Sequence, residues 1–232
     1  SLALGKPNSG LKKLGLNPTQ FITIEQKFTT ENSHEFCAFL RRLFPNLQHL
    51  AIVIPRFLSY NPNVLFTLLA QWQHQLITLV IDNKLSESYS GALRHHINLM
   101  PNLKHLSVGF GFKVALSQLA PTLGRLERFA IKSPNDSSEV FQHLGPAPCT
   151  HLWCDTKPFT MSQLTESLHT HSQLFGRLIH LRLRSEFDDN RMNLLCGHVP
   201  NLRYLDIVFC RPYKVRKRQS VSNLFPIRLV SV

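Results

Sequence analysis

The sequence predicts an α/β solenoid of about eight repeats, in which parallel strands line a concave face and helices cover the convex face. Three observations support this fold. One phrase recurs almost unchanged at residues 45–52, 101–108 and 200–207. Looser copies of its apolar pattern, L-x-x-L-x-L with Ile, Val, Phe or Cys as substitutes, fill the intervals between these three. Each copy is followed by apolar residues at helical spacing, so strand and helix alternate along the chain.

Each strand is expected at the start of one copy of the pattern. The intervals between successive starts range from 23 residues (Leu103 to Leu126) to 36 residues (Leu11 to Leu47), which leaves room for a helix in each repeat. The eight first positions are Leu11, Leu47, Leu76, Leu103, Leu126, Cys149, Leu178 and Leu202.

The helices are predicted from apolar residues spaced i, i+3 and i+4. Proline follows three of them, at the start of the recurring phrase, because proline cannot continue a helix. The expected helices span Glu31–Leu43, Asn63–Trp72, Ser90–Leu99 and Val114–Leu123, and shorter ones begin near Ser137 or Ser138, near Thr160, and near Asp188 or Asp189.

The pattern predicts one repeat domain over residues 1–232, with the core repeats at 31–208. Residues 1–30 form an irregular N-terminal repeat or cap, in which Phe21–Ile24 is either an extra strand or part of a long loop. Residues 209–232 hold a basic loop and then an apolar segment, Phe225–Val230. We expect this segment to cap the last repeat, because the final apolar layer of a solenoid has no neighbouring repeat.

Side-chain alternation along each strand predicts which residues face a partner. Positions four and six of the pattern point into the core, and positions three, five and seven point to the concave face. The richest part of that face combines basic, aromatic and acidic residues, and we name it the concave patch: Arg128, Lys132, His151, Trp153, Asp155, His180, Arg182, Arg184 and Tyr204. Because Arg, Trp and Tyr most often dominate binding energy, the concave patch is the predicted partner-binding surface. The alternative is a polar lining that serves solubility alone.

Four of the eight residues at position three are histidines, and neighbouring parallel strands lie about 4.8 Å apart, so they should form a column. His151 and His180 are close enough in this arrangement to share an ion, but no third ligand is evident. Zinc sites usually have three or four protein ligands, so no metal site is predicted. Packed histidines repel one another once they are protonated, near a pKa of about 6.5, which predicts an effect of pH on stability.

The charge of the chain favours acidic partners. Lys and Arg number 26 against 14 Asp and Glu, a net charge of +12. Such a balance suits nucleic acid, an anionic membrane surface or an acidic protein face. A basic run in the C-terminal segment is a candidate nuclear-import or phosphate-contacting site, although such runs are commonly only solvated loops: Lys214, Arg216, Lys217 and Arg218.

Compartment and chemistry are also constrained by residue usage. The five cysteines are odd in number and form no C-x-x-C pair, which indicates a reducing, intracellular location in cytoplasm or nucleus. No apolar run approaches the roughly 20 residues that span a bilayer, and no membrane partner is expected. No nucleophile elbow, zinc-protease motif or phosphate-binding glycine loop is present, so we predict neither an enzyme nor a cofactor.

The phrase F/M/V-P-N-L-x-x-L, at Phe44–Leu50, Met100–Leu106 and Val199–Leu205, resembles the intracellular leucine-rich repeats of F-box proteins and of the broader ribonuclease-inhibitor-like group. In F-box proteins the repeats hold a substrate, while a separate F-box docks the Skp adaptor of a cullin ubiquitin ligase. No F-box is visible here. The resemblance therefore implies either an F-box before Ser1 or another repeat protein on the same scaffold, and no F-box residue can be carried over.

Two functions are expected on these grounds. The first is a protein-interaction module that binds a protein on its concave face, either as the substrate-recognition part of an F-box-type ligase receptor or as an assembly adaptor. The alternative is a nucleic-acid-associated repeat protein, such as an RNA export or processing factor, which the net charge of +12 favours.

Overall fold

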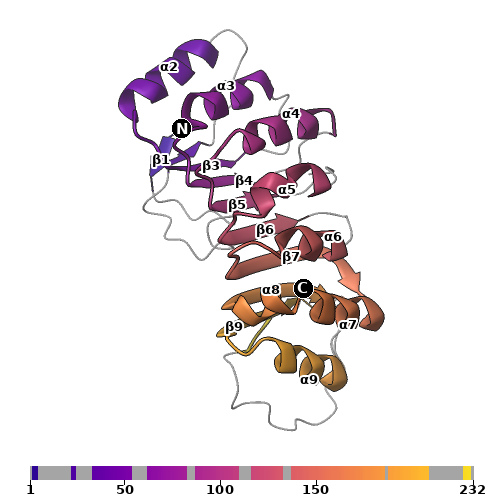
Figure 1. Cartoon of the computed structure of the whole chain (residues 1–232). Helices are drawn as coiled ribbons and strands as arrows, with labels where there is room; N and C mark the ends of the chain where they lie inside the picture. Colours follow the sequence, from indigo (N-terminus) through magenta and orange to yellow (C-terminus); the bar gives the residue numbers. More distant parts are fainter. Residues whose placement is uncertain are drawn as a thin grey trace.

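A computed structural model describes residues 2–4, 22–24, 33–53, 62–82, 87–109, 116–132, 137–185, 188–208 and 227–230. The strands stack side by side in one continuous ladder, and the helices lie along one side of it (Figure 1). Chain order is preserved along the ladder, from the indigo N-terminal elements to the yellow C-terminal ones. The predicted α/β repeat solenoid is thus confirmed.

The sheet follows chain order without a crossover. Within it β1 and β2 pair antiparallel, and every later neighbouring pair is parallel. The seven strands from β3 to β9 alternate with helices in an open parallel sheet, as parallel pairing requires a crossover helix between strands. The strands are β1 (Leu2–Leu4), β2 (Ile22–Ile24), β3 (His49–Val53), β4 (Thr78–Asp82), β5 (His105–Val108), β6 (Arg128–Lys132), β7 (His151–Phe159), β8 (His180–Ser185), β9 (Tyr204–Val208) and β10 (Ile227–Val230).

The two ends of the sheet include strands from the segments that were predicted to cap the repeats. Of the two alternatives for Phe21–Ile24, the structure has the strand, β2, which pairs with β3. At the other end β10 pairs with β9, so part of the segment Phe225–Val230 continues the sheet beyond the last repeat. The predicted first repeat strand, Leu11–Leu16, and the basic run Lys214–Arg218 lie outside the described residues.

The predicted helices begin and end close to their expected positions, and α8 (Ser172–Arg177) is an additional helix that the pattern did not predict. One predicted helix differs in kind. Within the segment predicted as Val114–Leu123, Leu116–Leu119 forms a 3₁₀ helix, and a short α-helix follows with Pro121 in its first turn, where a missing N–H is tolerated. The helices are α2 (Ser33–Leu43), α3 (Pro62–Trp72), α4 (Glu87–Asn98), η3 (Leu116–Leu119), α5 (Ala120–Leu123), α6 (Ser137–Leu144), α7 (Met161–Thr170), α8 (Ser172–Arg177) and α9 (Asp189–His198).

Two of the expected helix caps are present. The Thr160 side chain accepts a hydrogen bond from the Gln163 backbone, and the Gln163 side chain accepts one in return from the Thr160 N–H, a reciprocal capping box. Asp188 Oδ1 accepts from the Arg191 N–H at 2.8 Å. These bonds satisfy N–H groups that the first helical turn leaves without an intrahelical partner.

The register places equivalent positions of successive repeats side by side. His105 pairs with Arg128, and Arg128 pairs with His151, so position three forms the predicted column. Positions four and six of β3 to β9 all belong to one continuous hydrophobic core, which confirms the predicted faces. Leu106 and Leu181, both at position four, are fully buried. Close packing of this core against the helices fixes the opposite face of each strand toward the concave side.

The asparagine of the recurring Pro-Asn-Leu phrase also has a structural role. Asn102 Nδ2 donates to the His74 carbonyl at 2.6 Å, and Asn201 Nδ2 donates to the Gly176 carbonyl at 2.6 Å. Each bond runs from one repeat to the C-terminal end of a helix in the repeat before it, or to the residues just after that helix. The phrase therefore supplies both the helix terminator and a polar contact that joins neighbouring repeats.

Candidate partner-binding site

The concave patch is assembled by the register of β6 to β9. Its members come from four neighbouring strands, and six of them lie in two rows that pair across the sheet on the same face. One row is Arg128, His151, His180 and Tyr204. In the next row Trp153 and Arg182 of the patch stand between Ala130 and Asp206. Lys132 pairs with Asp155 beyond them, and Arg184 extends from β8 toward that pair. All nine residues predicted from the sequence therefore lie on adjacent strands.

The centre of the patch is a cation–π contact. The Arg182 guanidinium carbon lies 3.8 Å from the Trp153 ring centre, well inside the roughly 6 Å range of such contacts. The Trp153 ring also packs on a small apolar cluster, Ala51, Val80 and Ala130, which is separate from the main core. Trp153 is therefore half-buried on the concave side, with its ring fixed by the sheet below and the guanidinium beside it.

Asp206 is a member of the site that the predicted set leaves out. Its Oδ2 lies 3.8 Å from Arg182 Nη1 and 3.6 Å from His180 Nε2, and its side chain is 17 % exposed. Burial lowers the pKa of His180, and the Asp206 carboxylate opposes that shift. The signal was present in the sequence, because Asp206 occupies position five of the repeat that follows Arg182. Its contacts orient the guanidinium that lies beside Trp153.

Asp155 joins the two remaining cations of the patch. Its carboxylate oxygens lie 3.8 Å from Lys132 Nζ and 3.7 Å from Arg184 Nη1. The register between β7 and β8 shifts between Cys154 and Phe159, so Asp155 stands where the ladder becomes irregular. Bulges of this kind redirect side chains and are frequent beside functional sites.

Aromatic rings line the first row of the patch. The rings of His151 and His180 meet edge-on with centres 5.9 Å apart, and His180 meets Tyr204 at the same separation. Tyr204 is 55 % exposed and is the most accessible ring of the row. Burial, followed by the nearby Arg128 charge, lowers the pKa of His151 to about 4. Histidine titration was expected near a pKa of about 6.5, and the pKa of His151 lies below that value because its ring is desolvated.

The N-terminal half of the same column is arranged differently. His49 Nδ1 and His105 Nδ1 each lie 3.0 Å from the Thr78 hydroxyl, so one buried hydroxyl bridges two imidazoles. Position five in this half holds small residues, Ala51, Val80 and Ser107, which are almost completely buried. They face the concave side as predicted, but burial makes them unavailable to a partner.

Titratable groups elsewhere offer little for chemistry in the part of the chain that the structure describes. No three His, Cys, Asp or Glu side chains there gather closely enough to hold a metal ion. Burial raises the pKa of Cys149 to about 12 and also raises that of Cys154, so both thiols stay protonated. A search of the described helices for one long and apolar enough to cross a membrane finds none.

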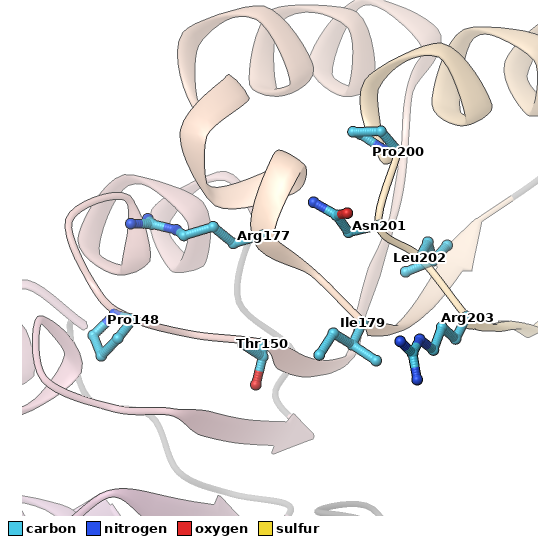
Figure 2. A pocket seen from close by; sticks show the side chains of 8 residues that line it. All are labelled: Pro148, Thr150, Arg177, Ile179, Pro200, Asn201, Leu202 and Arg203. Carbon is cyan, nitrogen blue, oxygen red and sulfur yellow. The ribbon is translucent and has the colours of Figure 1, made fainter.

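A pocket of about 620 Å³ lies at the ends of the sheet strands where β7, β8 and β9 begin, and Figure 2 shows its lining residues. None of these residues belongs to the concave patch. Sequence reasoning did not find it, because its lining comes from turns that the repeat pattern treats as punctuation. The lining residues are Pro148, Thr150, Arg177, Ile179, Pro200, Asn201, Leu202 and Arg203.

Comparison with known proteins gives no family for this chain. A scan against protein-family models finds no match, and a search of curated proteins finds no significant relative.

Proposed function

We propose that this chain is a non-enzymatic leucine-rich-repeat interaction module that binds a protein partner through the concave patch. The observation that carries the proposal is the stack of Arg182 on Trp153 at 3.8 Å, with the exposed Tyr204 on the strand after Arg182. Arg, Trp and Tyr are enriched among the residues that dominate binding energy. Here they are already positioned, which reduces the ordering cost of association.

The charges of the patch favour a protein over nucleic acid. Lys132 and Arg184 each lie near Asp155, and Arg182 lies near Asp206. A phosphate backbone is bound mainly through counterion release by unneutralised Lys and Arg. Carboxylates beside three of these cations reduce that gain and instead suit a partner surface with charges of both signs.

The resemblance to F-box repeats supports a more specific form of the proposal. In that form the chain is the substrate-recognition part of an F-box-type ubiquitin ligase receptor. An alternative form makes the chain an adaptor within an assembly. An intracellular location in cytoplasm or nucleus fits the cysteines, since Cys37, Cys149, Cys154 and Cys196 are free thiols in the described part of the chain.

A nucleic-acid-associated role is the second candidate. It rests on the net charge of +12 and on the basic run Lys214–Arg218, which lies outside the described residues. Binding that falls steeply with salt would favour this candidate.

The test compares two exposed aromatic residues on different surfaces. Tyr204 of the patch is 55 % exposed, and Phe39 of α2 is 50 % exposed, so Tyr204→Ala and Phe39→Ala remove similar accessible rings. The tagged wild type and both variants are used to recover partners from a nuclease-treated cell lysate, and the recovered proteins are quantified. We expect Tyr204→Ala to lose a stoichiometric protein partner that Phe39→Ala retains.

Other outcomes are equally informative. Retention by Tyr204→Ala together with loss by Phe39→Ala would place docking on α2 and refute the concave patch. Partners that disappear on nuclease treatment would favour the nucleic-acid role. Recovery of Skp and cullin subunits with the full-length form of the protein would support the ligase form of the proposal. A single partner without ligase subunits would support the adaptor form.

A further inference from the structure

The pocket in Figure 2 is built by three successive repeats. Thr150, Ile179 and Arg203 immediately precede β7, β8 and β9, and Arg177 closes one end from the last turn of α8. The backbone holds these segments in fixed register: the Ile179 N–H donates to the Thr150 carbonyl at 2.8 Å, and the Arg203 N–H donates to the Ile179 carbonyl at 2.8 Å. The pocket is therefore a preformed feature of the solenoid edge.

The polar lining of the pocket is cationic. Arg177 and Arg203 are its charged residues, and none of the eight lining residues is acidic. The carboxylate of Glu127, which occupies the corresponding edge position of the preceding repeat, lies 2.8 Å from Lys104 Nζ. That carboxylate is already paired, and among the described lining residues the two arginines give the pocket a positive potential.

Arg203 retains its side-chain donors for a ligand, whereas Arg177 retains only those that are neither bonded to Gly145 nor buried. Arg177 Nη2 donates to the Gly145 carbonyl at 2.7 Å, which anchors the guanidinium, while its buried Nε has no hydrogen-bond partner in the described structure. The exposed Arg203 side chain makes no hydrogen bond or ion pair with the residues that the structure describes. A guanidinium carries five N–H donors in a planar fork that matches a carboxylate.

The remaining lining distinguishes a peptide from nucleic acid. Pro148, Ile179, Pro200 and Leu202 supply apolar surface between and around the cations. No lining residue is aromatic, whereas single-stranded nucleic acid is held by bases stacked on aromatic rings. A volume of about 620 Å³ lies within the usual range of ligand pockets, about 300–1,000 Å³.

We propose that this edge pocket binds an acidic peptide segment of a partner protein. Carboxylates of the segment pair with Arg177 and Arg203, and apolar side chains between them contact the proline, isoleucine and leucine surfaces. This site is separate from the concave patch and does not depend on the function proposed for it. A partner that reached both sites would gain from their linkage, because the second contact becomes intramolecular.

The test measures binding of a short labelled peptide of alternating Glu and Leu by fluorescence polarisation. Wild type is compared with Arg203→Glu in the pocket and with Arg42→Glu on α2, an exposed arginine that changes the net charge identically. We expect Arg203→Glu to weaken binding at least about tenfold, a change of about 1.4 kcal/mol, and Arg42→Glu to leave it unchanged. The same peptide with Gln in place of Glu should bind weakly.

Several results would overturn the proposal. Failure of wild type to bind the peptide would do so directly. Equal weakening by Arg42→Glu and Arg203→Glu would show attraction to net charge alone. Loss of binding in Tyr204→Ala with full binding in Arg203→Glu would move the peptide to the concave patch. Tighter, Arg203-dependent binding of a single-stranded oligonucleotide would assign the pocket to nucleic acid. Thermal unfolding of each variant by circular dichroism checks that folding is intact.

Discussion

The two halves of the concave face share one backbone geometry and differ in how their side chains are used. On β3 to β5 the side chains at position three hydrogen-bond to one another, with Thr78 bridging His49 and His105. On β7 to β9 the same column ends in the exposed ring of Tyr204, beside the half-buried Trp153. In this solenoid the small position-five residues are almost completely buried, and the larger ones on β7 to β9 stay partly exposed.

The position-five residues of the two halves differ in size and burial. Ala51, Val80 and Ser107 are almost completely buried. Trp153 is only partly buried and packs against the apolar cluster of Ala51, Val80 and Ala130. A surface that must meet a partner needs residues of the second kind.

The largest expected effect is a loss of folding stability on removing a core leucine, and it should be the same in both halves. Leu106 and Leu181 are fully buried at position four of β5 and β8, facing the helices rather than the concave side. Substituting either with Ala should lower the free energy of unfolding by about 2–5 kcal/mol through lost burial and the cavity left behind. Chemical denaturation measures both. A much smaller cost for Leu181→Ala would mean that the halves differ in their cores as well as on the concave face.

A smaller effect concerns pH and histidines in both halves. Burial, followed by the Arg128 charge, lowers the pKa of both His105 and His151 to about 4. As the pH falls, the unfolded chain therefore binds protons at these histidines before the folded chain does. The contribution of each neutral histidine to the free energy of unfolding is complete above about pH 6.5 and is lost as the pH falls toward about 4. We expect a loss of about 1–2 kcal/mol for each histidine once solvent screening is allowed for. Urea unfolding on either side of this window measures it.

Asp206 gives this pH effect a matched control. Its carboxylate opposes the lowering of the His180 pKa, and it is not among the groups that shift the pKa of His105. Asp206→Asn should therefore lower the pKa of His180 further while the pKa of His105 stays unchanged, as followed by NMR titration of the imidazole protons. Equal movement of both values would contradict separate electrostatics in the two halves.

The smallest expected effect isolates the cation–π contact of the C-terminal half. A double-mutant cycle with Trp153→Leu and Arg182→Met should give a coupling energy of about 0.5–1 kcal/mol, because the pair is only partly desolvated. Asp206 also contacts Arg182, so the cycle is repeated in the Asp206→Asn background. A coupling near zero in both backgrounds would mean that the stacked geometry adds nothing beyond packing.

Much of the scaffold could be predicted from the sequence. The apolar pattern placed Leu106 and Leu181 in the core, and helix starts were predicted near Thr160 and near Asp188 or Asp189. These features depend on residues within one or two helical turns or on strict alternation, so a linear sequence contains them. The nine predicted patch residues came together for the same reason, because a parallel register carries position onto position.

The remaining features of the site depend on neighbours that are distant in sequence. The orienting contact of Asp206 with Arg182 joins different repeats, and so does the Thr78 bridge between His49 and His105. No local pattern encodes the distance, burial or lowered pKa of such groups, since each is set by desolvation and by charges on other strands.

The sequence by itself determined the repeat, the alternation of strand and helix, and which face of each strand enters the core, because these follow from periodicity and chain stereochemistry. Only the tertiary structure decided which concave residues are covered and which are exposed, and that turns before β7, β8 and β9 meet around a pocket between Arg177 and Arg203. Burial and electrostatic environment are properties of packed neighbours, and packing joins repeats that lie far apart along the chain.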